Sequence, residues 1–73
     1  MNDKQVALDA CDSAQKDRVT RAASVYIDAF LTAEGQPNAD ALRKEAGERF
    51  KLGLRVLKAA HESSRALVEQ VFP

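Results

Sequence analysis

One short interruption divides this 73-residue chain into two long segments, and it constrains the fold more than any other feature. It reads Gly-Gln-Pro-Asn at positions 35–38. Gly35 suits the residue just past a helix end, because glycine adopts the left-handed conformation without strain. Pro37 cannot continue a helix, and Asn38 can cap the next one. The sequence therefore predicts a helix over about residues 3–34, a turn at 35–38 and a helix over about 39–72.

A connection this short makes the two helices antiparallel neighbours, so we expect a single all-α hairpin domain spanning residues 1–73. Glycine and proline are few elsewhere in the chain, which suits long helices. Asn2 can cap the first helix, with Gln5 reaching back to it. Asp12 offers a second cap, so a short extra N-terminal helix that breaks near Asp12-Ser13 is the alternative.

Apolar residues recur along both segments at steps of three and four, which places them on one face of each helix. In the first helix this face consists of Leu8, Cys11, Val19, Ala22, Tyr26, Ala29, Phe30 and Ala33. In the second helix the seam consists of Leu42, Ala46, Phe50, Gly53, Leu57, Ala60, Ser64, Leu67 and Val71. We expect the two helices to pack through these faces, with the small residues allowing a close approach.

The second helix carries a further uncharged stripe that a hairpin leaves uncovered. It consists of Leu52, Val56, Ala59, Ser63, Ala66 and Gln70. A helix packed against one neighbour is normally polar around its other half, and this one is not. The first helix has a weaker strip, in which Ile27 and Leu31 lie away from the Tyr26 face. The simpler interpretation is that alanine and serine merely fill an exposed helix surface.

The chain is too short to build an adequate core from two helices, so burial against another surface is favoured over surface filling. Two hairpins related by a twofold axis would form a four-helix bundle, which makes a homodimer the expected state. The predicted partner or dimer interface consists of Ile27, Leu31, Leu52, Val56 and Ala59.

Chemistry-bearing residues are scarce. One cysteine excludes an intramolecular disulfide, and one histidine without a nearby cysteine argues against a structural zinc site. We interpret Cys11 as a packed thiol and His61 as a residue at the edge of the seam. The sequence has no phosphate-binding glycine loop and no paired metal-ligand motif. We therefore predict no catalytic, metal or cofactor site, and we do not expect an enzyme.

Basic residues give the best argument for nucleic acid as an alternative partner. They are Lys51, Arg55, Lys58 and Arg65 on the second helix. Glu62 and Glu69 dilute this stripe, no aromatic residue is interleaved for base stacking, and the formal net charge is zero. In topology and size the expected dimer resembles the Rop type of plasmid-encoded, RNA-binding dimer of two hairpins. That resemblance implies an RNA-binding regulatory protein acting through the basic stripe, without a motif that transfers individual residues.

The remaining signals concern location and class. The chain has no long apolar run and no signal-peptide pattern at its start, so neither membrane spanning nor export is predicted. A single cysteine fits a reducing cytoplasm. Small helical hairpins also occur as secretion chaperones and as phage or mobile-element inhibitors. We therefore expect a cytoplasmic, non-enzymatic protein–protein interaction module of a small bacterial or phage type, acting as an adaptor, chaperone or inhibitor.

Overall fold

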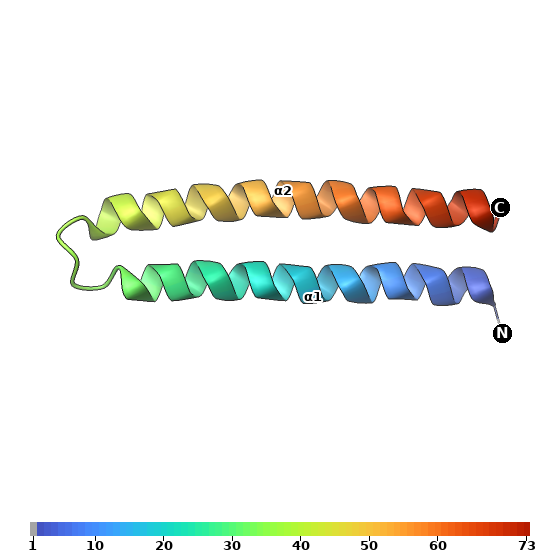
Figure 1. Cartoon of the computed structure of the whole chain (residues 1–73), viewed down its shortest axis with the longest axis horizontal. Helices are drawn as coiled ribbons and strands as arrows, with labels where there is room; N and C mark the ends of the chain where they lie inside the picture. The colour runs from blue at the N-terminus through green and yellow to red at the C-terminus, as the bar shows by residue number, and fades with distance from the viewer. Residues whose placement is uncertain (1) are drawn as a thin grey trace.

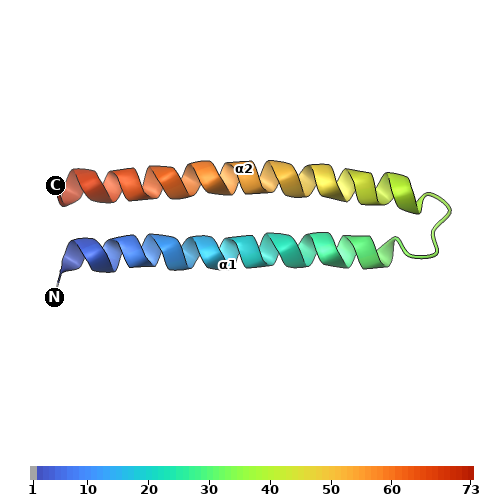
Figure 2. The ribbon, with the colours of Figure 1, turned by 180° about the vertical axis from the view of Figure 1, so that it is seen from behind.

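Two α-helices joined by one turn make up the computed structural model, which describes residues 2–73 (Figure 1). Helix α1 spans Asp3–Thr32 and helix α2 spans Ala39–Val71. The helices run antiparallel and side by side, and opposite views show the start of α1 and the end of α2 at the same end of the rod (Figures 1 and 2). The predicted all-α hairpin is confirmed.

The structure confirms the predicted conformation of Gly35 in the turn, but the end of α1 and the cap of α2 differ from the prediction. Gly35 has φ +79°, as expected for the glycine after a helix. Helix α1 ends at Thr32, about two residues earlier than predicted. Asn38 does occupy the cap position of α2, but the prediction of a side-chain cap is wrong. Its φ of −108° and ψ of 30° lie outside the extended geometry that a capping side chain needs.

At the start of α1 the Asn2 cap is confirmed, since its side-chain oxygen accepts a hydrogen bond from the Gln5 amide at 3.2 Å. The Gln5 side chain does not reach back to Asn2. It donates instead to Asp9 at 2.8 Å. Helix α1 continues without interruption through Asp12, so the alternative of a short extra helix is wrong.

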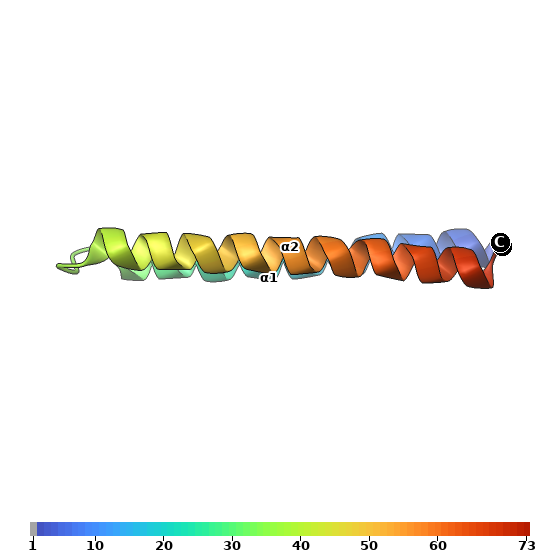
Figure 3. The ribbon, with the colours of Figure 1, turned by 90° about the horizontal axis from the view of Figure 1, so that it is seen from above.

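The hairpin is a thin rod with almost no interior. Seen from above, α2 lies over α1 along most of its length (Figure 3). The extents are 56 × 19 × 7 Å, and the radius of gyration is 16.9 Å. A compact chain of this length would have a radius of gyration of about 11 Å. Within residues 2–73, only Leu8 and Ala33 are buried.

Aromatic residues in the turn-side half of the hairpin make contacts between the helices. The Tyr26 ring lies 5.2 Å from the Phe50 ring across the hairpin and 6.2 Å from Phe30 along α1, measured between centroids. The Arg43 guanidinium covers the Phe30 ring at 3.9 Å, which is within range of a cation–π contact. Arg43 also donates to the Phe30 carbonyl oxygen at 3.2 Å and to Glu34 at 3.3 Å.

The seam predicted for α2 is only partly the face that meets α1. Its half-buried members are Ala46, Phe50, Gly53, Leu57 and Ser64, whereas Leu42, Ala60, Leu67 and Val71 are exposed. Towards the C-terminus the half-buried residues are His61, Arg65, Val68 and Phe72 instead. Each follows an expected seam residue by one position, which is about 100° around a helix. Contacts from α1 to His61 and Arg65 hold α2 in this rotated position, so the heptad seam turns partly outward.

Substituting the glycines tests this backbone description. Gly35→Ala should destabilise the hairpin by about 1–2 kcal/mol, because an L-residue is strained at positive φ. Gly47→Ala should stabilise it by up to about 1 kcal/mol through helix propensity. A methyl group there would meet only the Tyr26 ring, at an ordinary 4.0 Å. Thermal unfolding followed by circular dichroism measures both, and equal effects of the two substitutions would contradict the assignment of the turn.

Candidate functional site

The predicted interface residues lie outside the contact between the helices. The exposed fractions are 54% for Ile27, 61% for Leu31 and 60% for both Leu52 and Val56. All six residues of the α2 stripe, which we call the outer stripe, are exposed: Leu52, Val56, Ala59, Ser63, Ala66 and Gln70. A charge-free surface of this kind on a long helix is suited to contact with another macromolecule.

The structure does not gather all the predicted interface residues into one patch. Ile27 and Leu31 belong to α1, whereas Leu52, Val56 and Ala59 belong to α2. None of the three grooves found on the described chain contains a member of either set. The two sets are therefore separate exposed surfaces of one rod.

A second uncovered surface runs along one side of the hairpin, where three open grooves follow the line between the helices. We call it the grooved face. From α1 it is lined chiefly by Ala10, Cys11, Ala14, Arg18, Ala22, Val25 and Ala29. From α2 it is lined chiefly by Leu42, Ala46, Arg49, Gly53, Leu57, Ala60 and Ser64. Sequence reasoning missed this face as a unit, although it identified most of its α2 residues as a seam.

The grooved face is dominated by small side chains. The lining of the groove nearest the termini includes Ala10, Ala14, Ala60 and Ser64. The lining of the central groove includes Ala22, Ala29, Ala46 and Gly53. Small residues keep both helix backbones close to the surface, so a further helix could approach closely. No enclosed cavity for a small molecule is formed by this arrangement, because each groove is open to solvent.

The predicted nucleic-acid residues share one helix but are partly neutralised. Lys51 lies 3.5 Å from Glu48, and Arg65 lies 2.7 Å from Asp12. Within residues 2–73 no ion pair involves Arg55 or Lys58, so these two carry the uncompensated positive charge of the stripe. The exposed surface is thus less basic than the sequence alone indicates.

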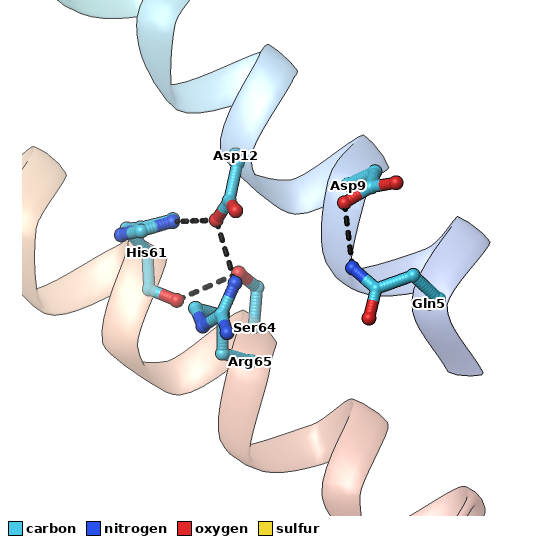
Figure 4. A network of polar contacts seen from close by, with 6 residues as sticks. All are labelled: Gln5, Asp9, Asp12, His61, Ser64 and Arg65. Atoms are coloured by element: carbon cyan, nitrogen blue, oxygen red, sulfur yellow. Dashed lines mark hydrogen bonds and ion pairs between the residues drawn. The ribbon is translucent and has the colours of Figure 1, made fainter.

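A polar cluster joins the helices in their terminal halves (Figure 4). One Asp12 carboxylate oxygen lies 2.7 Å from His61 Nε2 and 2.7 Å from Arg65 Nη1. Ser64 donates a hydrogen bond to the His61 carbonyl oxygen at 2.8 Å. Hydrogen bonds from His61 and Arg65 hold the pKa of the Asp12 carboxyl below its usual value, while desolvation opposes them.

The Asp12 cluster is a clamp between helices. Asp12 and His61 lie on different helices, so the spacing of residues along one helix could not predict their contact. Only the pairing of the two helices in the structure shows that Asp12 is the carboxylate partner of His61. The imidazole is 27% exposed and the carboxylate 52% exposed. Such exposed pairs orient packing more than they stabilise it.

Other chemistry is sparse in the part of the chain that the structure describes. Cys11 is a free, half-buried thiol, in line with its interpretation as a packed residue. Over positions 2–73, no three histidine, cysteine, aspartate or glutamate side chains converge as metal ligands. Neither α1 nor α2 contains an apolar stretch that could cross a bilayer.

The lowered pKa of Asp12 gives a pH dependence with a defined sign. Because the folded-state pKa is depressed, the contribution of Asp12 to stability is present above its ordinary pKa of 3.8 and is lost as pH falls through the folded-state value. Replacing His61 by alanine should raise the Asp12 pKa, and so should Arg65→Ala, because each removes a hydrogen bond to the carboxylate. Carbon-13 NMR titration of the Asp12 carboxyl measures both shifts, with Arg55→Ala as a matched control. An Asp12 pKa unchanged in both variants would contradict the clamp.

A scan of protein-family models, a search of curated proteins and a search of solved structures each found no match to this chain.

Proposed function

We propose that this chain is a non-enzymatic protein–protein interaction module that works as a homodimer of helical hairpins in a four-helix bundle. Its role is that of a small adaptor, chaperone or inhibitor. The observation that carries the proposal is the exposure of Leu52 and Val56, each 60% open to solvent on an uncharged helix surface. The free thiol of Cys11 supports a reducing cytoplasm as the location.

Size supports self-association. Only two residues of the described chain are buried, so a lone hairpin gains little from the hydrophobic effect. Small domains of this length are usually supported by oligomerisation, a metal, disulfides or unusually regular helix packing. A second hairpin supplies the missing core in the simplest way, because it adds two matching helices at once.

The outer stripe supports protein binding beyond self-association. Its residues repeat at steps of four and three over Leu52 to Gln70, which matches the contact line of one helix lying along another. Ile27 and Leu31 add a second exposed apolar site on α1. Recognition by a helix laid along an apolar surface is a common mode of protein binding.

A doubly charged variant tests the outer stripe. Light scattering of the wild type should give twice the 8.0 kDa mass of the chain. In affinity capture from the source cells, the wild type should recover a partner at fixed stoichiometry that Leu52→Asp/Val56→Asp fails to recover, because an unpaired charge cannot be buried cheaply. Arg55→Asp/Lys58→Asp, on the same helix, is the matched control and should still recover it. The same recovery by both variants would exclude the outer stripe as the docking surface.

RNA binding by the basic stripe is the alternative, favoured by the lack of an ion-pair partner at Arg55 and Lys58 within residues 2–73. It predicts a gel shift with structured RNA at low ionic strength, with an affinity that falls steeply as salt is added. Arg55→Glu/Lys58→Glu should then abolish the shift, whereas Leu52→Asp/Val56→Asp should preserve it. If the wild type gives no shift at low salt, RNA binding is ruled out.

A further inference from the structure

The grooved face carries two rows of uncovered small and apolar residues, one from each helix. The α1 row includes Ala10, Ala14 and Val25, and Val25 is 68% exposed. On α2 the exposed seam residues Ala60, Leu67 and Val71 continue the line of Ala46 and Gly53. A single helix laid in the groove would cover the centre but not both rows. Two such rows fit an occupant that is two helices wide.

The rotation of the heptad seam indicates where that occupant lies. In a two-helix contact, the strongest apolar line of a helix should point at its one neighbour. In α2 that line is displaced, because Leu67 and Val71 are 56% and 70% exposed while Val68 and Phe72 are half-buried. A helix in a four-helix bundle points its apolar line between two neighbours. The displacement of α2 is towards the grooved face, since Ala60 and Ser64 line it.

The solvent-exposed area of the hairpin exceeds that of a compact monomer of the same mass, by an amount that fits the interface of a dimer. The hairpin exposes 5650 Å² to solvent. A compact monomer of 8.0 kDa would expose about 4,450 Å², so each chain exposes roughly 1,200 Å² in excess. Two copies that removed this excess would bury about 2,400 Å² in total, which is in the range of obligate homodimers.

We infer that a second copy of this chain covers the grooved face, which becomes the core of the dimer and leaves the outer stripe free for a protein partner. The inference deepens the proposed function and depends on its homodimer. A second hairpin has the required width of two helices and the same length. Its α2 carries the same outward-turned seam, which can pack against the first copy. The formal net charge of zero imposes no overall repulsion between copies.

Close packing in this dimer depends on the small residues. If Gly53 were replaced by alanine, the new methyl group would meet no atom within 4 Å outside the adjoining helix backbone. The space above Gly53 is therefore open, and a partner backbone can approach there. Ala60 and Ser64 extend this low surface towards the termini. The larger Leu57 lies between Gly53 and Ala60 in sequence and lines the same groove as Ala60.

Adjacent alanines on α2 separate this inference from the proposed function. Ala60→Glu places a charge on the grooved face, and Ala59→Glu places the same charge on the outer stripe. We expect Ala60→Glu to weaken dimerisation at least about 100-fold in sedimentation equilibrium, because an unpaired charge would be buried at the interface. Ala59→Glu should keep the wild-type dimer but lose capture of the partner. Dissociation by Ala59→Glu and not by Ala60→Glu would overturn the inference while leaving the homodimer intact.

The natural thiol gives a second readout that needs no disruptive substitution. Cys11 lines the grooved face, so a thiol reagent should modify it slowly in the dimer and faster once dilution produces monomer. In the variant Cys11→Ser/Ala59→Cys, the new thiol should react at the same rate at both concentrations. A Cys11 rate that does not change across the dissociation range overturns the inference. A wild-type chain that is monomeric at every concentration overturns the proposed homodimer as well.

Discussion

Each helix of this molecule has only one neighbour, and most other properties of the structure follow from that constraint. Two antiparallel helices lying side by side share a single line of contact, so apolar residues elsewhere on either helix stay in water. The burial of only Leu8 and Ala33 within residues 2–73 is the direct result. Val25, Leu52 and Val71 are 68%, 60% and 70% exposed, because one line of contact cannot cover apolar residues on several sides of two helices at once. The exposed apolar residues are the observation on which the proposed self-association rests.

Polar contacts between the helices determine which residues of α2 lie against α1. Asp12 binds His61 and Arg65, and at the two ends of the rod Lys4 pairs with Glu69 and Arg43 with Glu34. These pairs place polar side chains of α2 against α1, at positions that an apolar seam would otherwise take. Each contact is modest on its own because it is exposed. Together they fix the rotation of α2 and leave the heptad line facing the groove.

Local signals in the sequence were sufficient for the elements and insufficient for their rotation. Gly35 and Pro37 located the turn, and the steps of three and four located both helices, because these depend on neighbours in the chain. The short turn also made the antiparallel arrangement predictable. The contact between Asp12 and His61 was not predictable, since it joins residues 49 positions apart through side-chain geometry. The same limit explains why Leu67 and Val71 were placed on the face towards α1.

The position of the aromatic contact near the turn has a consequence for how the rod forms. Tyr26 and Phe50 close a much shorter stretch of chain than Lys4 and Glu69, which must close almost all of it. Loop-closure entropy grows with the length of the loop, so pairing should begin beside the turn and advance like a zipper towards the open end. Backbone amides near the termini should accordingly exchange with solvent sooner than those beside Tyr26. An assembly built on this rod would gain most from contacts that hold its open end together.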